Sequence, residues 1–118
     1  MENKIFKICP QDDWEKAKSE QVFKGSGIDL IDGFIHFSTQ NQVIETARIH
    51  FSKKESLVLL EIESKNLNLK WEKSRNGDLF PHLYENLQLR TIIEVYKLEL
   101  DNDKKHIFPK HLTHKRSL

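Results

Sequence analysis

The sequence has little of what several protein classes require. It contains one cysteine, Cys9, which excludes both an intrachain disulfide and a cysteine-rich zinc site. A single thiol fits a reducing compartment, and we expect a cytoplasmic protein. The longest uninterrupted apolar run, residues 57–60, is far shorter than the roughly 20 residues of a membrane-spanning helix. The N-terminus has no long apolar stretch of the kind found in signal peptides.

The chain also lacks an excess of charge of either sign. Its 118 residues include 19 Lys and Arg against 18 Asp and Glu, and 37% of them are hydrophobic. This composition is too apolar for a disordered chain, and its net charge is too small to indicate a nucleic-acid or membrane partner. The length favours a single domain with one core.

Basic residues gather at the C-terminal end. Residues 1–103 carry 14 basic and 18 acidic side chains, whereas residues 104–118 carry five basic and no acidic ones. We therefore interpret residues 1–109 as the domain and residues 110–118 as a flexible basic tail. The alternative is a basic arm that binds RNA or an acidic partner. The tail has no aromatic side chains to stack on bases, which weakens the RNA alternative.

Hydrophobic periodicity predicts an α+β fold. Residues 91–100 alternate as a half-buried strand does, and Thr39 with Gln42 forms a capping box that begins a helix over residues 40–52. A shorter helix is predicted after Pro10, and residues 24–33 are predicted to form a loop. The other predicted strands are residues 4–8, 34–37, 57–62, 67–72 and 106–108. Because strands outnumber helices, we expect a split, curved and mostly antiparallel sheet with two main helices.

Several conspicuous residues fit structural roles. Gly25-Ser26-Gly27 lacks the downstream Gly-Lys-Ser/Thr of a phosphate loop and is predicted to be a plain turn. Cys9 has no activating partner in sequence, which favours an inert thiol. His50 lies on the apolar face of the second predicted helix, where a core histidine is expected. No histidine pair on a predicted helix has metal-ligand spacing, so no metal is expected.

Residues 33–40, Gly-Phe-Ile-His-Phe-Ser-Thr-Gln, form the first segment with functional promise. His36 lies in a predicted strand that leads directly into a helix N-terminus. Free backbone N–H groups, the hydroxyls of Ser38 and Thr39 and an imidazole therefore meet in one place, which suits a hydroxyl-rich or anionic ligand. The structural alternative is that Thr39 caps the helix and His36 binds a neighbouring carbonyl.

Residues 70–84 form the second such segment. Trp, Glu, Arg, Asp, His and Tyr occur within fifteen positions around a glycine turn and a proline. Polar and aromatic groups this dense in a loop are typical of sites built on a rigid sheet. A well-bonded structural loop, with its turn fixed by Pro81, is the alternative.

These segments carry a family resemblance. Ile-Phe-Lys-Ile at 5–8, Gly-Phe-Ile-His-Phe-Ser-Thr at 33–39, Trp-Glu at 71–72 and Leu-Phe-Pro-His-Leu-Tyr at 79–84 resemble the bacterial domain of unknown function 952. The resemblance covers about residues 5–109. That family is similar to a compact ADP-ribosyltransferase-like fold, a split, mainly antiparallel sheet that grips NAD in a cleft. Many members carry histidine where this chain has Lys7, and glycine where it has Glu85.

The resemblance implies a site in which His36 and Ser38 line the cleft, and it makes NAD the expected substrate. Cleavage of the nicotinamide–ribose bond develops a sugar cation that a carboxylate stabilises, by analogy with glycoside hydrolysis. Glu72 is the first candidate for this carboxylate, before Glu85 and Asp78. The predicted catalytic residues are Glu72, His82 and His36, and the predicted ligand-binding residues are Lys7, Ser38, Thr39, Arg75 and Tyr84.

Two functions therefore remain open. One is a nucleotide-binding enzyme of ADP-ribosyltransferase type, and the other is a non-catalytic ligand- or protein-binding module on the same fold. The geometry distinguishes them, because an enzyme needs Glu72 or another acid to face the same cleft as His36 and His82.

Overall fold

The computed structural model of the chain describes residues 3–113. Its strands are β1 (Lys4–Pro10), β2 (Val22–Phe23), β3 (Ile35–His36), β4 (Leu57–Glu63), β5 (Lys70–Lys73), β6 (Leu79–Leu83), β7 (Leu87–Gln88) and β8 (Ile92–Leu98). Its helices are α1 (Gln11–Glu20), α2 (Ile28–Asp32), α3 (Gln40–His50) and α4 (Lys110–Thr113), with the single 3-10 turns η1 (Arg75–Gly77) and η2 (Leu89–Thr91).

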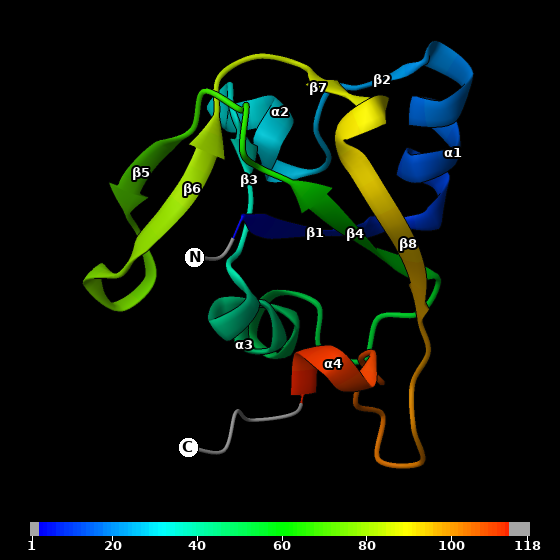
Figure 1. The fold of residues 1–118 in the computed structure, drawn as a ribbon. Coiled ribbons are helices and arrows are strands. Elements are labelled where there is room, and N and C mark those ends of the chain that lie inside the picture. Colours follow the sequence, from blue (N-terminus) through cyan, green and yellow to red (C-terminus); the bar gives the residue numbers. More distant parts are fainter. Residues whose placement is uncertain (1–2, 114–118) are drawn as a thin grey trace.

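The strands form antiparallel sheets that lie side by side (Figure 1). One sheet has the order β1-β4-β8, a second has the order β3-β6-β5, and β2 pairs with β7. A single bridge between Phe6 and Ser38 connects the edge of the first sheet to the chain just after β3. Every strand pair in the described residues is antiparallel. The predicted α+β class and the mostly antiparallel sheet are therefore confirmed.

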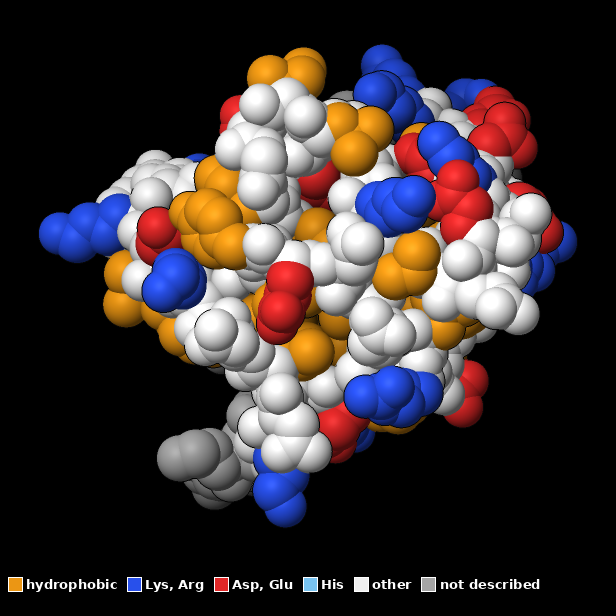
Figure 2. Space-filling view, turned by 90° about the horizontal axis from the view of Figure 1, so that it is seen from above, with side chains coloured by type: hydrophobic (Ala, Val, Ile, Leu, Met, Phe, Trp, Pro, Cys, Tyr) orange, Lys and Arg blue, Asp and Glu red, His pale blue; other side chains and the backbone are white. Residues whose placement is uncertain are grey.

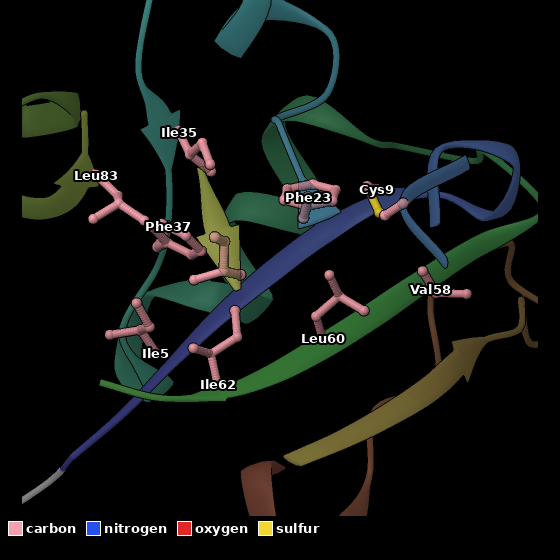
Figure 3. Packing of buried hydrophobic residues seen from close by; sticks show 11 residues of the cluster. Ile5, Cys9, Phe23, Ile35, Phe37, Val58, Leu60, Ile62 and Leu83 are labelled. Atoms are coloured by element: carbon pink, nitrogen blue, oxygen red, sulfur yellow. The ribbon is translucent and has the colours of Figure 1, made fainter. Parts of the chain in front are cut away.

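The core lies on both faces of the β1-β4-β8 sheet, because alternate side chains of a strand point to opposite faces. On one face Ile5, Cys9 and Leu60 pack with Phe23, as Figure 3 shows, together with side chains from α1 and β3. On the other face a second buried cluster contains residues of β1, β4, α3 and α4. The two main helices thus cover opposite faces of one sheet.

Both main helices occur where the sequence predicts them. In α3 the predicted capping box is present, because the Gln42 side-chain oxygen accepts a hydrogen bond from the Thr39 N–H at 3.0 Å. Val43 and Ala47 are buried toward the second cluster. The helix ends at His50 rather than at residue 52, since the chain leaves helical geometry at Phe51.

Two segments differ from the prediction. The predicted loop over residues 24–33 contains the short helix α2, and residues 70–84 form the hairpin β5–η1–β6 rather than a loop. Pro81 disfavours a strand assignment because it lacks an N–H, yet it lies in β6, where its carbonyl accepts a hydrogen bond from the Phe37 N–H at 3.0 Å. The predicted strand at 106–108 is reduced to one bridge between Leu100 and His106.

The predicted flexible tail begins too early. Its first four residues form α4, and Leu112 is buried in the second cluster together with Phe108. The Gln40 side chain also donates a hydrogen bond to the His111 carbonyl at 3.3 Å. Residues 110–113 therefore belong to the folded body, because one apolar side chain docks an otherwise polar segment. Residues 114–118 lie outside the described range, so the predicted flexible tail over these residues, and its alternative of an RNA-binding arm, stay predictions.

No helix within residues 3–113 combines the length and the apolar composition needed to cross a bilayer.

Candidate functional site

A cavity of about 600 Å³ lies against β1 and β3. It is lined by the loop before α2 and by α2 itself, and also by the C-terminal half of α3 and the η1 turn. Figure 1 shows α2 and α3 on opposite sides of β1, so the two helices contribute different walls. The volume falls within the roughly 300–1,000 Å³ typical of small-molecule sites.

The wall at α2 is organised around Asp29, whose side chain is fully buried. Lys7 Nζ lies 2.6 Å from Asp29 Oδ2, which also accepts the Ser26 N–H at 2.9 Å. Asp29 Oδ1 accepts a hydrogen bond from His36 Nδ1 at 2.6 Å and another from the His36 backbone N–H at 3.1 Å. Four donors thus converge on one carboxylate.

The charge of Asp29 is stabilised by these contacts. Burial raises the pKa of this carboxyl, but the hydrogen bond from His36 and the charge and hydrogen bond of Lys7, with the Ser26 N–H, outweigh burial. The net pKa lies below the usual range of an aspartate. Asp29 is therefore an anion at neutral pH, which matches the cationic partner that it holds.

His36 is held between two carboxylates. Its Nδ1 contacts Asp29, and its Nε2 lies 3.1 Å from Asp32 Oδ2. Both ring nitrogens of His36 are therefore engaged by carboxylate oxygens of α2. Asp32 is 35% exposed at its side chain, whereas Asp29 is buried, so Asp32 is the carboxylate of the network that faces solvent.

The turn predicted as plain is required by this network. Gly25 adopts φ +110°, and a Cβ on it would lie 2.9 Å from the Asp29 Cβ. The buried Ser26 donates its N–H to Asp29, and its hydroxyl contacts the Asp13 carboxylate. Gly25 and Ser26 are therefore fitted closely around Asp29.

The wall at α3 carries hydroxyl and guanidinium groups. Ser38 Oγ lies 2.9 Å from Thr46 Oγ1, which accepts a hydrogen bond from Arg75 Nη2 at 3.3 Å. The Arg75 guanidinium lies over the Phe80 ring at 4.9 Å and 3.5 Å from the Glu45 carboxylate. These contacts orient the Arg75 guanidinium, and its remaining N–H groups can still donate hydrogen bonds to a ligand.

Two further basic residues line this part of the cavity. His50, predicted as a core histidine, is exposed and lies on the cavity wall, because α3 turns its last residues away from the core. Lys54 also lines the cavity, and its ammonium lies 5.8 Å from the centre of the Phe51 ring. The wall at α3 is thus basic, whereas the wall at α2 carries three aspartates, Asp13, Asp29 and Asp32.

A second polar cluster lies on the β5–β6 hairpin. Glu72 Oε1 accepts His82 Nδ1 at 2.7 Å and the Tyr84 hydroxyl at 2.8 Å. These hydrogen bonds, first that from His82 and then that from Tyr84, hold the pKa of Glu72 below its usual range. His82 is buried, and its Nε2 has no hydrogen-bond partner within residues 3–113. Phe34 packs against His82 and Tyr84 with ring centres 4.5 and 4.8 Å apart.

The two clusters share one face of the β3-β6-β5 sheet. His36 and His82 are cross-strand partners, and their rings lie 5.0 Å apart. Because side chains alternate along each strand, Phe34 and Ser38 lie on the same face of the sheet as His36. Phe80 and Tyr84 lie on this same face together with His82. One end of this face opens into the cavity, and the other carries the Glu72 cluster.

The structure separates the predicted site residues. Lys7, His36, Ser38 and Arg75 line the cavity, whereas Glu72, His82, Tyr84 and Thr39 do not. Thr39 caps α3. Lys7 is engaged by Asp29 and by the His36 carbonyl, to which it donates at 2.9 Å.

Sequence reasoning missed Asp13, Asp29, Asp32 and Thr46. Asp29 and Asp32 lie within the Gly25–Gly33 segment, only a few residues before His36, and this proximity was the available signal.

The sequence also leads to expectations about the Cys9 thiol and about metal binding. Cys9 is buried, and burial raises its pKa to about 12, which keeps the thiol protonated and unreactive. Within residues 3–113, no group of three or more His, Cys, Asp or Glu side chains is arranged to hold a metal ion.

The chain is similar to one protein family and to solved structures of one protein. The model of the family described as "Protein of unknown function (DUF952)" matches residues 8–95. The crystal structure of protein CC0527 from Caulobacter crescentus is 42% identical, with a TM-score of 0.87 over 94% of this chain and 99% of that one. The solution structure of CC0527 gives a TM-score of 0.79 at 42% identity over 88% of this chain and 91% of that one. No curated protein matches the sequence.

Proposed function

The chain belongs to the DUF952 family, and we propose that it binds a nucleotide of the NAD or ADP-ribose class in the cavity between α2 and α3. The observation that carries this proposal is the opposite character of the two walls. A basic, hydroxyl-bearing wall at α3 faces a carboxylate-bearing wall at α2 within about 600 Å³. A ligand with phosphates at one part and a sugar or cationic ring at another is complementary to both walls.

Arg75 anchors one phosphate of the ligand in this proposal. Its guanidinium is already oriented by Thr46, Glu45 and the Phe80 ring. A planar fork suits phosphate oxygens, and preorganisation lowers the entropy lost on binding. The Ser38 hydroxyl and the Lys54 ammonium supply further donors on the same wall.

Asp32 receives the sugar end of the ligand. Carboxylate oxygens accept hydrogen bonds from ribose hydroxyls, and a carboxylate also attracts the positive nicotinamide ring of NAD. Asp29 is surrounded by protein donors, so the partly exposed Asp32 is the better placed of the two.

The finer proposal is transferase chemistry on an ADP-ribosyltransferase-like fold. It requires a carboxylate beside the sugar that becomes cationic. Glu72 lines no part of the cavity, so the proposal assigns this role to Asp32. A cytoplasmic location, which the single reduced thiol favours, belongs to the same proposal.

A non-catalytic binding module is the second candidate. The position of Glu72, bonded to His82 and Tyr84 outside the cavity, favours it over an enzyme that uses Glu72 as its carboxylate. Binding without turnover is the outcome that supports this candidate.

Calorimetric titration with ADP-ribose, NAD and NADH tests the proposal. We expect saturable binding of ADP-ribose, and tighter binding of NAD than of NADH because only NAD carries the ring cation. Arg75→Met should weaken binding by about tenfold or more, the loss of a charged hydrogen-bonding group. Arg48→Met is the matched control, since Arg48 also contacts Glu45 but is 69% exposed.

Nicotinamide release from NAD decides between the two candidates. Release that is abolished by Asp32→Asn and kept by Glu72→Gln supports the enzyme. The absence of binding for all three nucleotides would refute the proposed function.

A further inference from the structure

We propose that the four donors around Asp29 form an oxyanion site, which Asp29 fills when no ligand is bound and which a phosphate group of the ligand occupies in its place. The anion site itself follows from the contacts of Asp29. Its use by a nucleotide rests on the proposed function, in which Arg75 holds one phosphate and this site holds the adjacent one.

The donors are arranged as a receptor for a two-oxygen anion. Each carboxylate oxygen of Asp29 receives one backbone N–H and one cationic or ring nitrogen: Ser26 N–H and Lys7 Nζ on Oδ2, and His36 N–H and Nδ1 on Oδ1. Convergent backbone N–H groups with a lysine are the groups that proteins use to hold phosphate.

The donors are held in place by contacts other than Asp29. Lys7 Nζ also donates to the His36 carbonyl at 2.9 Å, and the Ser26 hydroxyl contacts Asp13. His36 Nε2 is held by Asp32, and its ring packs on Phe34 at a centroid distance of 4.5 Å. Removing the Asp29 carboxylate therefore leaves a formed site rather than a collapsed one.

The helix α2 is attached to the rest of the protein by few buried apolar side chains, so Asp29 can move out of the donor site. Asp29 is the one buried residue of this five-residue helix, while Ile28, Leu30 and Ile31 are 60%, 65% and 83% exposed. Figure 2, a view from above Figure 1, shows hydrophobic side chains exposed to solvent on this face of the molecule, near the top of which α2 lies in Figure 1. The helix is therefore held by its aspartate rather than by apolar burial, and its outward movement uncovers little apolar surface.

Glycines flank α2 on both sides. Gly27 and Gly33 adopt φ +56° and +84°, and a Cβ on either would meet no atom within 4 Å. These positions have the conformational freedom and the space to act as hinges. A phosphate that enters from the cavity replaces the Asp29 carboxylate by another anion, so the Lys7 ammonium keeps a counter-charge.

Chemical rescue tests the anion site directly. We expect Asp29→Ala to lower the unfolding midpoint, and sodium phosphate to restore it more than sodium chloride of equal ionic strength does. Asp32→Ala is the matched control, because Asp32 lies on the same helix and contacts the same histidine but is partly exposed. Phosphate should stabilise Asp29→Ala more than it stabilises Asp32→Ala or the wild type, by mass action.

If Asp29→Ala is unfolded in sodium chloride, the same test is whether sodium phosphate makes it fold. Circular dichroism measures this folding. Asp29→Asn, which keeps the shape of the side chain, is titrated in parallel. Equal effects of phosphate on the wild type and on both Asp29 variants would overturn the proposed site.

The affinity for ADP-ribose tests whether a ligand uses the site. If Asp29 competes with the ligand phosphate, Asp29→Asn binds ADP-ribose more tightly than the wild type, by about tenfold when the closed state dominates. Weaker binding by Asp29→Asn means that Asp29 is structural and overturns the displacement. If no variant binds ADP-ribose while phosphate still rescues Asp29→Ala, the proposed function fails and the anion site stands.

Discussion

The two polar clusters on one face of the β3-β6-β5 sheet contain similar residues in opposite arrangements. In the cavity cluster the carboxylate of Asp29 is buried and receives four donors. In the hairpin cluster the carboxylate of Glu72 is 41% exposed, and its partner His82 is the buried member. An aspartate and a histidine therefore form part of a cavity wall in one place, and a glutamate and a histidine form a surface contact in the other.

The difference shows that residue type alone does not mark a site. Both clusters pair an acid with a histidine at 2.6 or 2.7 Å. Only the first of them lines the cavity, and only there is a cation buried beside the carboxylate. Access to an enclosed volume, rather than the hydrogen bond itself, distinguishes the candidate site.

The largest contrast is expected between Lys7→Met and Glu72→Gln. Lys7→Met leaves the buried Asp29 charge without its ammonium and should lower the free energy of unfolding by about 3–5 kcal/mol. Glu72→Gln alters an exposed group and should have a far smaller effect. Urea denaturation of both variants measures the difference. Equal losses would show that the two clusters are energetically alike.

A second contrast concerns the glycine beside each cluster. Gly25→Ala brings a Cβ to 2.9 Å from the Asp29 Cβ and keeps φ +110°, so we expect a loss of about 2–3 kcal/mol. Gly77→Ala, in the hairpin turn at φ +77°, meets no atom within 4 Å and should lose only the strain of positive φ, about 1 kcal/mol. Thermal unfolding of the pair is the measurement, and a larger loss for Gly77→Ala contradicts it.

The cross-strand histidines provide a third contrast. His36→Phe removes donors from Asp29 and Asp32 and should lower the free energy of unfolding by about 2 kcal/mol. His82→Phe removes the Nδ1 contact with the partly exposed Glu72 and a buried Nε2 that has no partner within the described residues, and it keeps a ring against Phe34, so its loss should be smaller, about 1 kcal/mol or less. Denaturation curves that rank the two variants in the reverse order would break the comparison.

The smallest expected effect is a shift of one pKa. Tyr84→Phe removes one of the two hydrogen bonds that hold the pKa of Glu72 below its usual range, so this pKa should rise toward its ordinary value. A lowered folded pKa gives stability that is present above the unfolded pKa and is lost as the pH falls through the folded pKa. Carbon-detected NMR titration follows the Glu72 carboxyl. An unchanged pKa means that His82 alone sets it.

Much of the fold follows from local sequence signals. The capping box of Thr39 and Gln42 places the start of α3, and the alternation after Thr91 places β8. The helix α2 carries no such signal, because it is only five residues long and it buries an aspartate while exposing its aliphatic residues. Pro81 conceals β6 for a different reason, since its lack of an N–H is atypical of an inner strand.

The site was predictable in part. His36 and Ser38 are adjacent to a helix start, and that local feature is visible in the sequence. The role of Lys7 depends on Asp29, which comes from a segment predicted to be a loop. The separation of Glu72 from the cavity depends on the pairing of β5 with β6, which lets its carboxylate bind His82 and Tyr84. Pairings between segments distant along the chain are set by tertiary packing, so local patterns do not reveal them.

Histidine NMR during titration with ADP-ribose tests the central claim most directly. The imidazole signals of His36 and His50, which line the cavity, should shift and saturate together, and those of the buried His82 should stay nearly unchanged. Arg75→Met should reduce the shifts at equal ligand concentration, and Arg48→Met should not. The account is contradicted if ADP-ribose leaves all three histidines unchanged, or if His82 responds while His36 and His50 do not.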